Sequence, residues 1–186
     1  MNTLDAYFKI FLRIALLSQL FNACVYAAPI SIAIVDFELN DLTYKLAPNA
    51  VNPEEMARTA SLKPLLEKAM VELGDYRIAA IDAKSEALAN AGFGYLFDHP
   101  DIAAGLGRKV GADWIITGRN HKASFLFVYF KAHLINTRTQ RWVADYSVEI
   151  KGQQHKITPK GVRRLARQID QTIRQQTAGN SDPEHQ

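Results

Sequence analysis

Residues 99–118 read HPDIAAGLGRKVGADWIITG and contain the passage from a helix into a strand. The segment His99-Pro100-Asp101 is a helix start with proline at the first helical position, and Gly111 is a typical helix end. The apolar run Trp114–Gly118 follows and predicts a buried strand. A helix that leads directly into such a strand is typical of an α/β sheet whose strands are joined by crossover helices.

Upstream of this stretch, the run Ile30–Phe37 (ISIAIVDF) carries no charge before Asp36, which predicts a strand covered on both faces. Residues 38–52 have the composition of a loop. Asn52-Pro53 then starts a helix that ends at Gly74, and Pro64 predicts a kink or two shorter helices. The expected apolar face of this helix consists of Met56, Ala60, Leu66, Ala69, Met70 and Leu73.

A second short strand is expected at Tyr76–Ile81, whereas Asp82–Phe97 fits neither a helix nor a strand clearly. Downstream, Phe125–Asn136 is strongly β-forming and apolar on both faces. Its partner strand alternates, and the side chains expected to face the core are Trp142, Ala144, Tyr146, Val148 and Ile150. Thr158-Pro159 starts a last helix with an apolar stripe of Val162, Leu165, Ile169 and Ile173.

The resulting order is βαβαβββα. It predicts a single three-layer α/β domain with a C-terminal helix and a mixed sheet, parallel where helices cross over and antiparallel where the hairpin is added. The expected limits of this Rossmann-like domain are residues 29–177, with a disordered tail at residues 178–186.

Residues 1–28 have the pattern of a cleavable secretory signal peptide: two basic residues, an apolar stretch too short to span a membrane, and small residues at Ala27 and Ala28. Two alternatives stay open. In the first, the segment is not cleaved and stays on the domain as an amphipathic helix. In the second, Cys24 is acylated after processing and the protein is a lipoprotein. The main expectation is a soluble periplasmic protein that begins at Ala28 or Pro29.

The composition is that of a soluble globular protein, with 48% hydrophobic and 22% charged residues and a formal net charge of +3. So small a charge argues against nucleic-acid binding. The positive residues concentrate in the segment from Lys151 to Arg174, so the last helix is either a solvated basic face or a docking face for anionic lipid or an acidic partner. Cys24, the only cysteine, lies in the leader, which excludes a disulfide in the mature domain.

No catalytic constellation is found in the sequence, and we expect no enzyme activity, cofactor or metal. The glycines of Gly105–Gly111 end a helix, whereas a phosphate-binding loop must open one. Asp98, His99 and Asp101 suggest an oxygen-rich metal site, but Asp98 or His99 is better read as the cap of the helix at Pro100. The serines lack the surroundings of a nucleophile elbow.

One candidate ligand site is the crevice that open α/β sheets form at the carboxyl ends of their parallel strands. The polar residues expected there are Asp36, Glu38, Asp82, Arg119 and His121. The alternative is that these are ordinary strand ends that meet water.

The run IAIVDFEL (32–39), the helix that closes at LGDYRI (73–78) and the block 99–118 followed by a long hairpin resemble the Rossmann-like domain shared by the TolB N-terminal domain, the curli secretion protein CsgG and the lipoprotein LpoB. The resemblance implies an uncharacterised exported bacterial protein that acts by binding or assembly. It carries over no catalytic residues.

The sequence therefore favours a non-enzymatic envelope protein that contacts an unidentified protein partner. The alternative is a periplasmic protein that binds a small ligand or metal in the crevice. The candidate partner surface is the row Phe125, Phe127 and Tyr129. If the first and last helices cover opposite faces of the sheet, this row belongs to the core; otherwise it stays open for docking.

Overall fold

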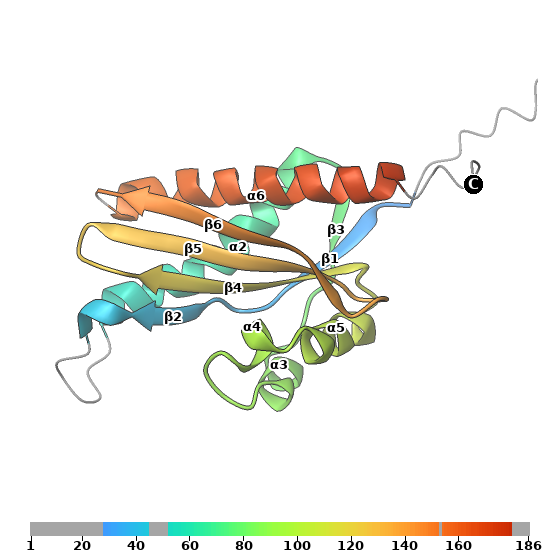
Figure 1. Ribbon diagram of the computed structural model, residues 1–186, viewed down its shortest axis with the longest axis horizontal. Helices are drawn as coiled ribbons and strands as arrows, with labels where there is room; N and C mark the ends of the chain where they lie inside the picture. The colour runs from blue at the N-terminus through green and yellow to red at the C-terminus, as the bar shows by residue number, and fades with distance from the viewer. Residues whose placement is uncertain (1–27, 45–51, 153, 180–186) are drawn as a thin grey trace, which may run out of the picture.

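The computed structural model describes residues 28–44, 52–152 and 154–179, which form one mixed sheet with helices on both faces (Figure 1). The strands are β1 (Ile30–Ile34), β2 (Glu38–Asp41), β3 (Tyr76–Ile78), β4 (Trp114–Lys122), β5 (Phe127–Asn136) and β6 (Arg141–Lys151). A 3₁₀ turn, η2 (Leu42–Tyr44), follows β2, and the helices are α2 (Pro53–Leu73), α3 (Ala83–Ala89), α4 (Tyr95–Asp98), α5 (Pro100–Lys109) and α6 (Gln154–Gly179).

The strand order is β3-β1-β4-β5-β6, with β2 paired to β4 beyond the end of β1. β1 is parallel to β3 and β4, and β5 and β6 add on antiparallel, as predicted. The expectation of a loop at residues 38–41 is wrong, because these residues form β2. The reason is that β4 continues past Gly118 to Lys122 and offers its edge to Glu38–Asp41 in parallel register.

The helices divide between the two faces of the sheet. α2 and α6 pack together on one face, and the predicted stripe Val162, Leu165, Ile169 and Ile173 is fully buried against the sheet. α3, α4 and α5 form a smaller core on the other face with Ile115 and Ile135. The arrangement with the first and last helices on opposite faces is therefore wrong, although the three-layer domain is confirmed (Figure 1).

α2 is one continuous helix through Pro64, so the expectation of two shorter helices is wrong. Pro64 and Ala60 both lie on the solvent side of α2, so the carbonyl that proline leaves without a donor faces water. The buried face also differs in the first turns, where Glu55 and Thr59 are buried and Met56 is exposed. This exchange occurs because the sheet offers polar partners there, which are described below.

β6 departs from strict alternation at its start. The pairing shifts between Leu134↔Ala144 and Ile135↔Trp142, so Val143 is an extra residue that reverses the direction of the side chains before it. Val148 and Ile150 are buried as predicted, but Trp142 is 47% exposed and lies 5.1 Å from the His133 ring on the opposite face.

The remaining differences concern the ends of elements. β3 is shorter than the expected strand, and Asp82–Phe97 contains two short helices, α3 and α4. α5 has His99 at its N-cap, without a side-chain capping hydrogen bond. The predicted leader and Cys24 lie outside the described residues, and α6 runs two residues into the predicted tail. Among the helices of the described ranges, none combines the length and apolar character that crossing a bilayer requires.

Candidate functional site

Two of the five predicted crevice residues meet directly. Glu38 and Arg119 are partners in the pairing of β2 with β4, and Arg119 Nη2 lies 3.1 Å from Glu38 Oε2. Glu38 Oε1 also accepts a hydrogen bond from the N–H of Gly94 at 2.7 Å. The Arg119 guanidinium lies 4.1 Å from the Phe97 ring centroid and 5.0 Å from that of Phe93. Arg119 thus ties the α3–α4 connection to the sheet.

Asp36 belongs to a separate cluster, next to the end of β1. Its carboxylate lies 2.9 Å from Lys63 Nζ, and its N–H donates to Glu86 Oε1 at 2.7 Å. Burial raises the pKa of Glu86. Burial alone lowers the pKa of Lys63, but Asp36 and Glu86 outweigh it and the net pKa is raised. These groups hold α2 and α3 against the sheet.

The other two predicted crevice residues have local roles. Asp82 is the N-cap of α3 and accepts from the N–H of Ser85 at 2.9 Å. His121 Nδ1 lies 3.1 Å from Asn40 Nδ2, and burial lowers the His121 pKa. Across the described ranges, no three acidic, histidine or cysteine side chains are placed to share a metal ion. The crevice residues therefore satisfy one another or the adjoining loops.

The structure divides the predicted partner row: Phe127 and Tyr129 lie on the face of β5 away from α2 and α6, whereas Phe125 borders the cavity on the side of those two helices. Val128 and Phe130 point to the core and are fully buried, whereas Phe127 and Tyr129 are half-buried on the other face. Phe125 and Leu126 precede β5 in the β4–β5 turn and are 79% and 60% exposed. In Figure 1, α5 lies near the start of β4, and α3 and α4 lie below its middle, so these helices do not reach the end of the hairpin at the β4–β5 turn. We call Phe127 and Tyr129 the aromatic face.

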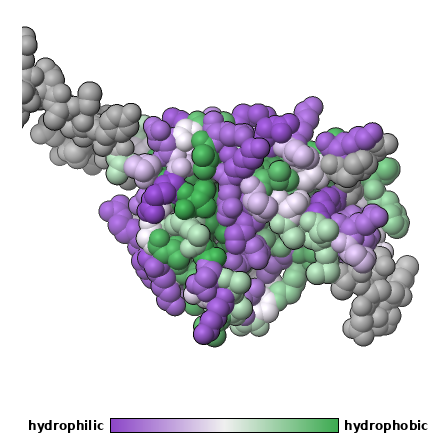
Figure 2. Space-filling model, turned by 180° about the vertical axis from the view of Figure 1, so that it is seen from behind, coloured by the Kyte–Doolittle hydropathy of each residue, from purple (hydrophilic) through white to green (hydrophobic). Residues whose placement is uncertain are grey.

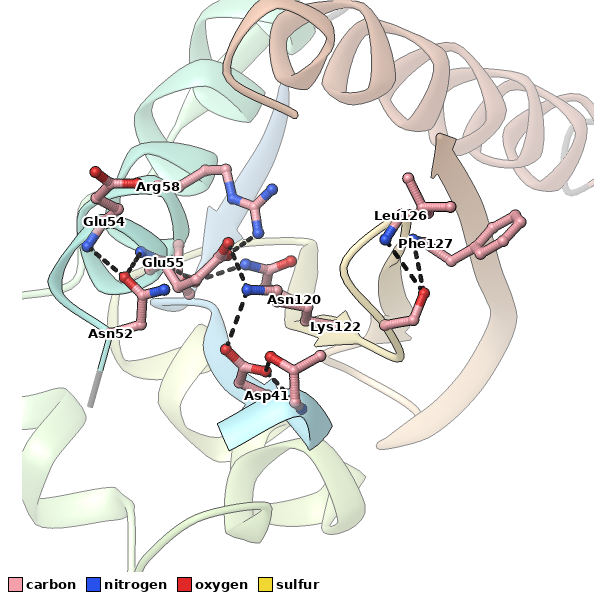
Figure 3. A network of polar contacts seen from close by, with 12 residues as sticks. Asp41, Asn52, Glu54, Glu55, Arg58, Asn120, Lys122, Leu126 and Phe127 are labelled. Carbon is pink, nitrogen blue, oxygen red and sulfur yellow. Dashed lines mark hydrogen bonds and ion pairs between the residues drawn. The ribbon is translucent and has the colours of Figure 1, made fainter. Parts of the chain in front are cut away.

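The β4–β5 turn that carries Phe125 is held from inside the turn. Ser124 Oγ accepts hydrogen bonds from the N–H of Leu126 at 3.3 Å and from the N–H of Phe127 at 3.1 Å (Figure 3). This arrangement satisfies two backbone donors locally and leaves the Phe125 and Leu126 side chains directed outward.

Below the turn, a buried polar cluster joins the end of β4 to the first turns of α2. Lys122 Nζ lies 3.0 Å from Glu55 Oε1 and 3.4 Å from Asp41 Oδ2, and Glu55 also pairs with Arg58 (Figure 3). The exposed fractions of the Lys122, Asp41 and Glu55 side chains are 6%, 8% and 10%. Buried charges persist only when they are paired, so this cluster fixes the position of the turn.

A second polar contact extends the cluster. Asn120 is fully buried on β4, and its Nδ2 donates to Thr59 Oγ1 at 2.7 Å, while Thr59 Oγ1 donates to the carbonyl of Glu55 at 2.7 Å. We name Asp41, Glu55, Arg58, Thr59, Asn120 and Lys122 the polar cluster. A cavity of about 480 Å³ opens beside it, between Arg58, Phe125 and Thr158.

The sequence analysis did not find the polar cluster. The signal was the alternation of β4, because continuing the inward row Trp114, Ile116, Gly118 by two further steps reaches Asn120 and Lys122. The sequence analysis ended this strand at Gly118, so Asn120 and Lys122 were not recognised as part of its inward row. With the longer strand, two polar residues would have been expected on a buried face, where they require partners.

Comparison with solved structures gives matches of low identity. The LpoB C-terminal domain from Escherichia coli is 12% identical, with 74% of this chain and 94% of that chain covered and a TM-score of 0.45. The lipoprotein GNA1162 from Neisseria meningitidis is 18% identical, with 76% and 97% covered and a TM-score of 0.47. TolB from Acinetobacter baumannii is 16% identical, with 83% and 30% covered and a TM-score of 0.46.

No curated protein sequence matches the chain significantly. A family model does match it, over residues 30–169, which spans the sheet from the start of β1 to most of α6. The chain therefore belongs to the family described as "Protein of unknown function (DUF2380)".

Proposed function

We propose that this chain is a non-enzymatic binding protein of the bacterial cell envelope and that its aromatic face docks a folded protein partner. The observation that carries the proposal is the exposure of that face: Phe127 and Tyr129 are only half-buried, no described helix covers them, and Leu126 is 60% exposed in the turn that precedes them. Exposed apolar clusters on a soluble domain generally mark interaction sites, because leaving them in water costs free energy.

The surroundings of the aromatic face support a protein partner. Tyr129 Oη donates to Glu149 Oε2 at 3.2 Å, and Lys151 Nζ lies 5.3 Å from the Phe127 ring centroid. Aromatic side chains with charged residues at their border are typical of the centre and rim of protein interfaces. The β-ladder from β4 to β6 and the polar cluster hold the face rigid, so little conformational entropy is lost on docking.

The proposed location is the periplasm, reached by a leader that is cleaved after Ala27 or Ala28. β1 begins at Ile30, so cleavage there leaves every described strand intact. Mass spectrometry of the protein isolated from its native envelope tests this step. A mature chain that begins at Ala28 or Pro29 supports it, an acylated Cys24 replaces it by the lipoprotein alternative, and an intact Met1 removes export.

Site-specific photo-crosslinking in cells that produce the protein naturally tests the docking surface. A photoreactive amino acid at Tyr129 is expected to form one discrete adduct with an envelope protein. The matched control carries the same amino acid at Lys68, an exposed position on α2 on the opposite side of the sheet. An equal adduct from both positions, or none from Tyr129 in a folded protein, contradicts the proposal.

A further inference from the structure

β6 is the last strand of the sheet and pairs only with β5 among the described strands. Two cavities adjoin its outer side, between β6 and α6. One, of about 230 Å³, is lined by residues 148–151 together with Ile157, Lys160, Gly161, Arg164 and Arg167. The other, of about 340 Å³, is lined by residues 145–147 together with Gln168, Gln171, Thr172 and Gln175. We call the two together the edge groove.

The edge groove runs along the backbone of β6. Consecutive residues of a strand point to opposite faces, so cavities lined by every residue from Asp145 to Lys151 lie along the edge of the strand and not over one face. The length of this segment matches an ordinary strand. α6 forms the other wall (Figure 1).

Within the part of the chain that the structure describes, the backbone of β6 has N–H and C=O groups that pair with no strand and are directed into this groove. The N–H of Gly152 donates to the carbonyl of Leu126, and hydrogen-bonded pairs alternate along an antiparallel ladder. Val148 and Ile150 therefore direct their N–H and C=O groups toward β5, and Ser147 and Glu149 direct theirs outward. The side-chain oxygen of Gln168 is also buried at the groove and accepts no hydrogen bond within the described ranges.

The groove is strongly basic at one end. Lys160, Arg164 and Arg167 follow one another on one face of α6 by four and three residues, and all three are exposed. Lys151, at the end of β6, also borders the cavity, but its Nζ lies 5.3 Å from the Phe127 ring centroid on the other face. Among the ion pairs within the described ranges none involves these four, and the acid Glu149 is hydrogen-bonded to Tyr129 on the other face. Figure 2, seen from behind, shows mostly hydrophilic side chains along the upper border, where α6 lies.

We propose that the edge groove binds an extended acidic segment of a partner protein, which adds to the outer edge of β6 as a further strand. Its backbone pairs with the outward groups of Ser147 and Glu149. Its carboxylates, carried on alternate residues and directed toward α6, pair with Arg164 and Arg167. This site is distinct from the aromatic face and adds a second contact.

The charge pattern decides against a second copy of this chain. The β6 strand of another copy carries Asp145 and Glu149, but Arg141 and Lys151 offset them, so it brings no net negative charge to the groove. A membrane would satisfy the charges of α6 but not the outward N–H and C=O groups of β6. The backbone groups therefore favour a peptide.

The test measures fluorescence anisotropy of a labelled peptide of about eight residues in which Glu alternates with Val, the length of an ordinary strand. The protein begins at Ala28 and carries single or paired substitutions. Arg164→Glu with Arg167→Glu is expected to weaken binding by about tenfold or more, because two ion pairs become repulsive. Arg163→Glu is the matched control, since Arg163 lies on α6 beside these residues but does not line the edge groove; it lines only the cavity next to α2, which Arg167 also borders. The effect of Arg163→Glu on peptide binding is expected to stay within about twofold.

Ser147→Pro separates strand addition from simple charge attraction. It removes the outward N–H of residue 147 and changes no charge. Because that N–H makes no hydrogen bond to β5, the melting temperature should stay the same while peptide binding is lost. Peptide binding that survives Ser147→Pro in a folded protein, or equal binding of a peptide with Lys in place of Glu, overturns the proposal. The proposal is also overturned if the protein does not bind the acidic peptide but does bind phosphatidylglycerol vesicles. The crosslinking experiment at Tyr129 tests the aromatic face and not the edge groove, so the two proposals can fail separately.

Discussion

Lys122 Nζ lies 3.0 Å from Glu55 Oε1, and the two side chains expose only 6% and 10% of their surfaces. The pair joins the end of β4 to the start of α2, and Asp41 completes it from β2. The end of β4, which is distant in the sequence from both β2 and α2, therefore meets them at one buried charge cluster.

Lys122→Met is expected to lower the free energy of unfolding by about 3–5 kcal/mol, because it leaves Glu55 and Asp41 buried beside each other without their shared cation. Chemical denaturation measures the change. Adding Glu55→Gln should recover part of the loss. Lys68→Met, which opens the exposed Lys68–Glu72 pair, is the control and should change stability by less than about 0.5 kcal/mol. A similar small effect at Lys122 would mean that the cluster contributes little.

The two rows of β5 should respond differently to truncation. Phe130→Ala removes a fully buried ring and should cost about 3–5 kcal/mol. Tyr129→Ala removes a half-buried ring on a face that no described helix covers and should cost about 1 kcal/mol or less. Thermal or chemical unfolding of the two purified variants gives the comparison. Equal costs would show that Tyr129 belongs to the core, and the aromatic face would then lose its role as a docking surface.

Gly118 is expected to tolerate no side chain. A Cβ atom at this position of β4 would overlap the ring of Phe37, which lies directly on the glycine. Gly118→Ala should therefore destabilise the protein by about 1–3 kcal/mol through overpacking. Gly105→Ala is the matched control within α5, where the nearest atom is the end of Arg108 at 3.8 Å, and it should stabilise the protein by about 1 kcal/mol. A neutral Gly118→Ala would contradict the close packing of Phe37.

His133 should make stability depend on pH. Its imidazole lies between the rings of Phe97 and Trp142, and burial lowers its pKa, although Asp145 at 3.3 Å acts in the opposite direction. The unfolded chain thus binds a proton at His133 more readily than the folded chain. The contribution of His133 to the free energy of unfolding should be fully present above about pH 6.5. The free energy of unfolding should then fall as the pH decreases below that value.

Urea denaturation at pH 7 and pH 5 measures this dependence, and His133→Gln provides the comparison, because glutamine does not titrate. The fall between the two pH values should be smaller in the variant than in the parent protein. His121, whose pKa is also lowered by burial, stays in both proteins and accounts for part of the remaining slope. An unchanged slope in the variant would contradict a neutral, buried His133.

The order of elements could be read from the sequence because local signals mark it. Asn52 caps α2, and its Oδ1 accepts from the N–H of Glu54 at 3.0 Å, as the Asn-Pro pattern predicts. The stripe of α6 and the antiparallel hairpin follow from side-chain periodicity in the same way. Trp142 was placed wrongly, because the bulge at Val143 depends on pairing with β5 and has no local signal.

The candidate sites could be predicted only in part. The sequence pointed to Glu38 and Arg119 at the strand ends and to Phe127 and Tyr129 in the hairpin, and the structure places the first two in contact and the second two on an uncovered face. The polar cluster was missed because Glu55 and Lys122 look like ordinary surface charges. Only a longer β4 brings them together inside the protein.

Capping residues and hydrophobic periodicity act over a few neighbouring positions, and for this reason the alternation of helices and strands, the mixed sheet and the buried stripe of α6 could be predicted from the amino-acid sequence. The packing of α2 and α6 on one shared face followed from the tertiary structure alone. It leaves no described helix over Tyr129 and no described strand beyond β6, beside Arg164 and Arg167. The physical reason is that the face a helix covers depends on which buried surfaces fit together across the whole chain, and this information is not present in any single segment.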